Sequence, residues 1–246
     1  MHSDFDRAAV RRAIVREGLS YLIHGALFPF GRRTAGPETR RDPSLRTVVF
    51  VHGLAANRSG FLPLQAALRL AGHHRQVAVS YRSSGSIEAL AVQLKRELDR
   101  RVGGGRIDLI AHSMGGLVAR VYLQQLGGAR RVDRLITLGT PHQGTYAASF
   151  LPSALVRQLL PDGPFIRHLN GLPPPERTRV TSIVAGRDLL VQPVEAAACP
   201  FGEVRRLEDL GHVELLFRPV VFAEVAAALG GPVPATGRSP CPGCGS

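Results

Sequence analysis

Continuous apolar runs alternate along the chain with segments in which apolar residues recur every three or four positions. The runs that are rich in valine, isoleucine and leucine are 47–54, 76–81, 107–112 and 135–141. Apolar side chains stand at helical spacing in 61–71, 87–101 and 117–126. Continuous runs indicate strands buried on both faces, and helical spacing indicates helices that cover them. This order predicts an α/β fold of three layers, α/β/α, around a doubly wound, mainly parallel sheet.

The alternation is interrupted at residues 146–176. That stretch combines an apolar helical stripe with proline-rich segments, and it precedes a strand from Val180 that ends before Asp188. A last strand begins at Glu203, and a closing helix is expected over 213–229. We interpret the interruption as a cap or lid over a pocket, and the alternative is a helix buried at the edge of the sheet.

The two ends of the chain differ in composition from its centre. Residues 4–30 form an arginine-flanked amphipathic segment, which either packs on the domain as an extra helix or lies at a membrane surface. The apolar part of this segment is too short to span a bilayer and lacks a small-residue cleavage site, so we expect no signal peptide. The predicted organisation is a segment and linker over 1–46, the α/β domain over 47–230, and a disordered tail over 231–246.

The net charge of +12 comes almost entirely from arginine, because Lys95 is the only lysine. The arginines are scattered along the chain rather than gathered on one element with aromatic residues, so nucleic-acid binding is not expected. The charge is more consistent with attraction to an acidic substrate or with peripheral contact with an anionic membrane surface, and a plain solvated surface is the simplest interpretation. Arginine, alanine and proline usage is typical of a GC-rich bacterial genome. The cytoplasm or its membrane face is the favoured compartment, and the oligomeric state stays open.

Cysteine usage gives no sign of a metal centre. Cys199 stands alone, and Cys241 and Cys244 form a single Cys-x-x-Cys pair that supplies two ligands where structural zinc needs four. No dense acidic cluster indicates calcium. We therefore expect no metal, no cofactor and no disulfide framework.

Residues 107–119 are the stretch on which the candidate chemistry depends. An apolar run breaks at Ser113, and an apolar helix follows after Met114 and two glycines. A serine at such a turn has a strained backbone, and only small side chains fit two positions away, where Ala111 and Gly115 stand. The segment resembles the nucleophile elbow of the α/β-hydrolase fold, Gly-x-Ser-x-Gly, with alanine in the first position as in some bacterial lipases. The alternative is an ordinary helix start.

Two further segments carry the same resemblance. His52-Gly53-Leu54 is similar to the loop after the first core strand of lipases, which implies that the Leu54 amide, with that of Met114, binds the oxyanion. Residues 140–145, Thr-Pro-His-Gln-Gly-Thr, resemble a segment of bacterial lipases and related lipid deacylases. The expected substrate-pocket residues are His52, His142, Leu155 and Leu159.

A serine hydroxyl needs a base that is itself held by a carboxylate. In the α/β-hydrolase fold these partners follow in the order Ser, Asp, His. Ser113, Asp188 and His212 meet that order, and each comes directly after a predicted strand. Other acids and histidines fit less well because they begin strands, lie in the insertion or stand too close to His212: Asp108, Asp133, Asp162, Asp209, His73 and His74.

The resemblance over residues 47–229 implies a serine hydrolase, a lipase or esterase that cleaves carboxylic esters with an apolar acyl chain through an acyl-enzyme. Two alternatives remain. The same residues would serve a lipid-modifying deacylase, a phospholipase or a thioesterase. A protein of this fold without catalytic activity would act as a binding protein.

Overall fold

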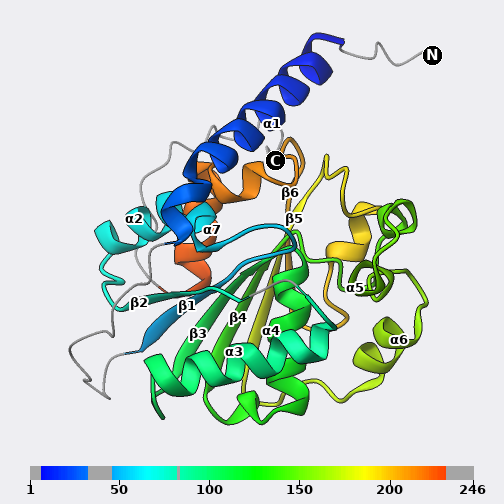
Figure 1. The fold of residues 1–246 in the computed structure, drawn as a ribbon. Coiled ribbons are helices and arrows are strands. Elements are labelled where there is room, and N and C mark those ends of the chain that lie inside the picture. The colour runs from blue at the N-terminus through cyan, green and yellow to red at the C-terminus, as the bar shows by residue number, and fades with distance from the viewer. Residues whose placement is uncertain (1–6, 33–45, 82–83, 231–246) are drawn as a thin grey trace, which may run out of the picture.

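The computed structural model describes residues 7–32, 46–81 and 84–230. Its centre is a sheet of six parallel strands in the order β2-β1-β3-β4-β5-β6 (Figure 1). The strands are β1 (Thr47–Val51), β2 (Gln76–Val79), β3 (Ile107–His112), β4 (Val132–Leu138), β5 (Arg179–Ala185) and β6 (Glu203–Leu207). The chain runs outward from β1 to β2 and then returns past β1 to β3, which is the doubly wound order predicted from the sequence. The predicted fold class is thus confirmed.

Helices cover both faces of this sheet. The helices of the described residues are α1 (Arg7–Leu27), α2 (Leu62–Leu70), α3 (Ile87–Arg101), α4 (Met114–Gln125), α5 (Ala154–Arg157), α6 (Pro164–Gly171) and α7 (Pro219–Ala228), of which α3 and α4 cover one face and α2 and α7 the other. Val49 belongs to the core beneath α3 and α4, whereas its neighbour Val48 belongs to the core beneath α2 and α7. Successive strand residues point to opposite faces, so each continuous apolar run supplies both cores.

The closing helix is shorter than predicted. Only a 3-10 turn, Glu214–Leu216, precedes α7, which begins at Pro219. Proline has no backbone N–H and its fixed φ suits the first turn of a helix, so the helix starts there rather than at residue 213.

The segment inserted between β4 and β5 packs against the domain. It contains a 3-10 turn, Tyr146–Phe150, followed by α5 and α6. Leu155, Phe165 and Leu169 are buried in the same core as α3 and α4. The inserted segment therefore contributes to the hydrophobic core, and its mobility as a lid remains a prediction.

Helix α1 leans over the domain and projects beyond it at one end (Figure 1). Arg16 Nε lies 3.1 Å from Glu214 Oε1, and the Glu17 carboxylate accepts hydrogen bonds from the amides of Val213 and Glu214. These polar contacts hold α1 against the loop that follows β6. Residues 33–45, most of the predicted linker, and residues 231–246, the predicted tail with Cys241 and Cys244, lie outside the described residues. The division at residues 46 and 230 stays a prediction.

Candidate active site

Ser113 occupies the turn between β3 and α4 with φ 54° and ψ −135°, in a region that residues other than glycine rarely adopt. The strand and the helix are held close together on either side of it. A Cβ atom on Gly115 would stand 2.5 Å from the carbonyl oxygens of both Val51 and His52. Only glycine fits at this position, and a tight turn of this kind presents the Ser113 side chain at the carboxyl edge of the sheet.

Asp188 and His212, which follow β5 and β6, form a buried pair. His212 Nδ1 lies 2.6 Å from Asp188 Oδ2. The other carboxylate oxygen, Oδ1, accepts hydrogen bonds of 2.8 Å from the amides of Leu190 and Val191. A carboxylate held in this way fixes the imidazole with its proton on Nδ1. Within the described chain His212 Nε2 has no hydrogen-bond partner and remains available as an acceptor.

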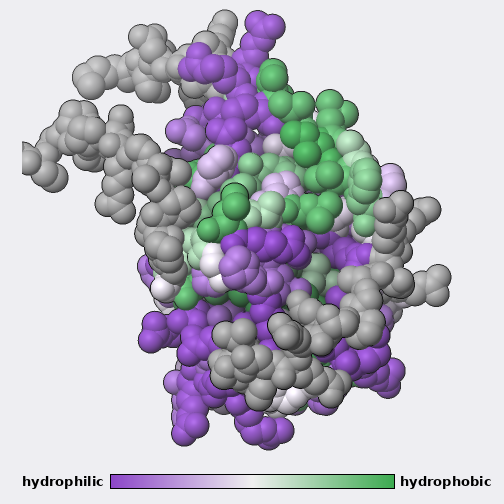
Figure 2. Space-filling view, turned by 90° about the vertical axis from the view of Figure 1, so that its left-hand side faces the viewer, coloured by the Kyte–Doolittle hydropathy of each residue, from purple (hydrophilic) through white to green (hydrophobic). Residues whose placement is uncertain are grey.

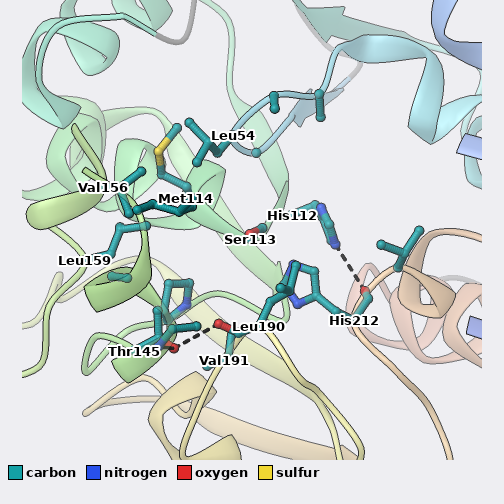
Figure 3. Close-up of a pocket in the computed structure, with 18 of the residues that line it drawn as sticks. Leu54, His112, Ser113, Met114, Thr145, Val156, Leu159, Leu190, Val191 and His212 are labelled. Atoms are coloured by element: carbon teal, nitrogen blue, oxygen red, sulfur yellow. Dashed lines mark hydrogen bonds between the residues drawn. The ribbon is translucent and has the colours of Figure 1, made fainter. Parts of the chain in front are cut away.

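Ser113 and His212 both line one cavity of about 390 Å³ (Figure 3). Its wall is mostly apolar, and the labelled apolar side chains in Figure 3 are Leu54, Met114, Val156, Leu159, Leu190 and Val191. A mostly apolar cavity with a few polar groups at one point suits a ligand with an apolar body and one reactive polar group.

The two amides expected to bind an oxyanion belong to residues beside Ser113. Met114 is the first residue of α4, where helix N–H groups lack partners within the helix. Gly53, which precedes Leu54, lies so near the nucleophile that a Cβ on it would stand 2.9 Å from Ser113 Cβ. Neither the Leu54 nor the Met114 amide has a hydrogen-bond partner in the described residues. This environment fits the expected donors.

His112 is a site residue that the sequence reasoning missed. Its Nε2 lies 3.2 Å from the backbone carbonyl oxygen of His212, and the two rings stand 4.8 Å apart between centroids (Figure 3). Complete burial, with a smaller contribution from His212, holds the pKa of His112 well below its usual range. His112 is therefore neutral, and its Nε2–H donates to the His212 carbonyl. Strand alternation places residue 112 on the same face of the sheet as Ile110. This alternation was the signal in the sequence that could have indicated the direction of the His112 side chain.

The expected pocket residue His52 lies outside the lining of this cavity. Its ring is buried and stacks on Tyr81 with 4.4 Å between centroids. Its Nδ1 donates to the Gly53 carbonyl at 2.9 Å, and the Tyr81 hydroxyl donates to the His52 carbonyl. His52 thus supports the 52–54 loop from behind, because the chain turns at Gly53 and carries the Leu54 backbone, rather than the imidazole, to the cavity.

His142, the second histidine expected in the pocket, is also absent from the lining. It is fully buried, with Nε2 at 3.0 Å from Thr137 Oγ1 and Nδ1 at 3.5 Å from Arg120 Nη1. Arg120 also donates to the Asn170 side chain and the Leu169 carbonyl of α6. The guanidinium can only donate, so Nδ1 accepts and the neutral ring donates from Nε2 to Thr137. His142 therefore belongs to a polar joint between α4 and the inserted segment.

Of the two leucines expected in the pocket, one lines the cavity and the other does not. All three residues Leu155, Val156 and Leu159 are buried in the same hydrophobic core, but only Leu159 and Val156 also line the cavity, so Val156 takes the place expected for Leu155. Adjacent residues of a helix point about 100° apart, and a stripe alone does not say which one faces the pocket. Tyr21 and His24 of α1 also line the cavity, which nothing in the sequence indicated.

The described part of the chain contains neither a cluster of metal ligands nor a membrane-spanning helix. No group of three or more histidine, cysteine, aspartate or glutamate side chains within it is placed to hold a metal ion. Cys199 is a buried free thiol whose pKa is raised by that burial. None of the described helices is both long and apolar enough to cross a membrane.

The architecture and the serine turn define the class as an α/β-hydrolase fold. The family description "palmitoyl protein thioesterase" matches residues 47–174, more than half of the chain. The chain belongs to this family. The matched region contains Ser113 and ends before Asp188 and His212, so the placing of those two side chains depends on the structure.

Relatives and solved structures agree with the class. Phospholipase A(1) LCAT3 of Arabidopsis thaliana is 38% identical over 69 residues, which cover 26% of this chain and 15% of that protein. Lipase B of Aspergillus fumigatus superposes with a TM-score of 0.65 at 17% identity, over 81% of this chain and 57% of its own. The mature Bacillus licheniformis lipase BlEst2 gives 0.60 at 17% identity, over 81% and 96%. The RedJ thioesterase of Streptomyces coelicolor gives 0.53 at 21% identity, over 83% and 92%. At these identities the structures show the fold alone.

Proposed function

We propose that this chain is a serine hydrolase that cleaves esters of carboxylic acids with an apolar acyl chain. The observation that carries the proposal is that the strained Ser113 shares one apolar cavity with His212, whose ring is held by the buried Asp188. The 2.6 Å contact leaves His212 Nε2 as the free basic atom, which is what a serine hydroxyl needs in order to become a nucleophile.

The proposed reaction has two halves. His212 Nε2 takes the Ser113 proton as Oγ bonds to the acyl carbonyl carbon, and the negative oxygen is held by the Leu54 and Met114 amides. The carbonyl reforms, the bond to the leaving group breaks, and the leaving group takes the proton from His212. Water then attacks the acyl-enzyme with His212 again as base, which releases the acid and restores Ser113. Asp188 keeps the imidazole oriented and stabilises its charged form throughout.

A thioester substrate is the second candidate, and the family to which the chain belongs favours it. The same groups would act on it, because a thiolate leaving group needs less protonation than an alkoxide. A lipid deacylase or phospholipase would differ in the group beyond the carbonyl rather than in the triad.

Hydrolysis of p-nitrophenyl esters from acetyl to palmitoyl, beside palmitoyl-coenzyme A, tests the proposal in wild type and Ser113→Ala. We expect activity that peaks at medium or long chains and is lost in the variant. A peak at acetyl or butyryl would contradict the apolar-chain assignment. Equal inertness of both proteins on every substrate would contradict hydrolysis and favour a binding protein.

A further inference from the structure

The mouth of the cavity is bordered by apolar side chains that remain open to solvent. Three separate segments each supply one residue that both lines the cavity and is about half exposed: Tyr21, Leu151 and Leu190. Each has a sequence neighbour that is more exposed still, at 72% for Leu22, 83% for Phe150 and 75% for Leu189. We call these six residues the apolar rim.

Helix α1 extends the apolar rim with apolar residues on its outward side. Its inward side makes the polar contacts of Arg16 and Glu17, and its outward side presents Ile14, Val15 and Leu19, each more than half exposed. Figure 2 shows hydrophobic residues gathered toward the right of the upper part of one face of the molecule, beside hydrophilic residues at its top and left, with hydrophilic residues covering the part below. A large exposed apolar area marks an interaction surface rather than ordinary solvent-facing surface.

Positive charge flanks this apolar surface. The sequence of α1 contains four arginines and one glutamate, and Glu17 is turned inward to backbone amides. Arg11 is exposed beside Val15, and Arg157 is exposed beside Phe150 and Leu151. Among the described residues neither Arg11 nor Arg157 pairs with a carboxylate. Exposed apolar side chains beside cations that meet no described carboxylate fit the interface of an anionic bilayer, where the apolar side chains enter the acyl region and the cations meet headgroups.

We propose that the apolar rim and the outward face of α1 dock on an anionic lipid membrane. Docking places the mouth of the cavity against the bilayer, so that an acyl chain passes from lipid to cavity without crossing water. The proposal depends on the proposed function only for the chemistry of the acyl substrate. The docking surface itself is defined by exposure and charge.

Sedimentation with phosphatidylcholine vesicles, with and without phosphatidylglycerol, tests this docking. We expect the full chain to bind the anionic vesicles, and Leu22→Gln with Phe150→Gln to weaken that binding by at least about tenfold, as the loss of buried apolar area dictates. Arg11→Gln with Arg157→Gln is expected to weaken binding to the anionic vesicles only. The matched control is Leu70→Gln, since Leu70 is 92% exposed at the end of α2 and does not line the cavity.

Three results would overturn the docking proposal. One is a wild-type chain that does not bind anionic vesicles, and another is an equal loss in Leu70→Gln. The third is unchanged vesicle affinity in Leu22→Gln with Phe150→Gln together with conversion of a wild-type dimer into a monomer, which would make the rim an interface between two copies. Labelling of Ser113 by a soluble fluorophosphonate, measured in parallel, keeps the two proposals apart. Vesicle binding without labelling contradicts only the proposed function, and labelling without vesicle binding contradicts only docking.

Discussion

His112 donates a hydrogen bond from Nε2 to the backbone carbonyl of His212 at 3.2 Å, across 100 positions of the sequence. The bond ties the loop that carries the proposed base to the residue immediately before the proposed nucleophile. We therefore expect it to fix the position of the His212 ring relative to Ser113 without taking a proton in the proposed reaction.

Replacing His112 with leucine is expected to lower kcat about tenfold with little change in KM for a short ester. The buried His212 carbonyl would lose its partner, which costs about 1–3 kcal/mol, and the loop would shift to recover one. Steady-state kinetics on p-nitrophenyl butyrate measures this split. His112→Gln supplies an amide donor and should recover part of kcat, whereas a merely structural role would leave the two variants alike. An unchanged kcat in His112→Leu would contradict the positioning role.

The stability of the protein should fall as the pH is lowered below about 6.5, partly through His142. Burial, with a smaller contribution from Arg120, holds the pKa of folded His142 well below the ordinary 6.5. Between those two pKa values the unfolded chain binds the extra proton, so lowering the pH favours unfolding. His142→Gln should reduce the pH slope of the unfolding free energy by up to about 1.4 kcal/mol per pH unit.

Urea unfolding at pH 7.5, 6.5 and 5.5 measures that slope. Contributions from other buried groups are common to both proteins and cancel in the difference. His74→Gln, a change at an exposed histidine in the loop before β2, is the control and should keep the wild-type slope. Equal slopes in His142→Gln and wild type would rule out this contribution.

Gly115→Ala should destabilise the fold strongly. The added methyl would stand 2.5 Å from two backbone carbonyl oxygens of the neighbouring strand and loop, neither of which can rotate away. Gly104→Ala is the matched control because a Cβ there meets nothing within 4 Å. We expect a loss of roughly 2–4 kcal/mol for Gly115→Ala and almost none for Gly104→Ala in thermal unfolding. Similar unfolding midpoints for the two variants would contradict the close packing of Gly115 against the two carbonyl oxygens.

The wall of the cavity should set acyl-chain length. Val156→Phe adds volume at a residue that lines the cavity, so the ratio of octanoyl to butyryl ester turnover should fall about tenfold, as expected for a few excluded methylenes. Val204→Phe, at a half-exposed position of edge strand β6, should keep the wild-type ratio. An unchanged ratio in Val156→Phe would place the acyl chain elsewhere. Leu155 is unsuitable for this test because it does not line the cavity.

Residue pattern alone predicted the sheet well because parallel strands buried on both faces leave continuous apolar runs, as in residues 47–51. The candidates Ser113, Asp188 and His212 came from the resemblance to the α/β-hydrolase fold, in which the partners follow in that order. Each of them follows a strand, and parallel strands bring their carboxyl ends to one edge. The roles of the other histidines could not be read in this way. His52, His112 and His142 all follow or end strands, and the path of each loop decides whether the ring faces the cavity, the core or a neighbouring carbonyl.

The part played by α1 was also beyond the sequence pattern. Its apolar residues suggested either packing or membrane contact, and the structure has Tyr21 at the cavity while Leu22 faces solvent. Which side of a helix packs depends here on the polar contacts of Arg16 and Glu17 with the loop after β6. Contacts that join residues almost 200 positions apart leave no periodic signal.

The most direct test of the central claim is the intact mass of the protein after treatment with a fluorophosphonate, with peptide mapping of the adduct. A serine activated by His212 and Asp188 is expected to gain a single adduct, located on Ser113, and Ser113→Ala is expected to gain none. His212→Ala should react at least about a hundredfold more slowly. An unlabelled wild-type protein, or equal labelling of Ser113→Ala, would contradict the assignment of Ser113 as an activated nucleophile.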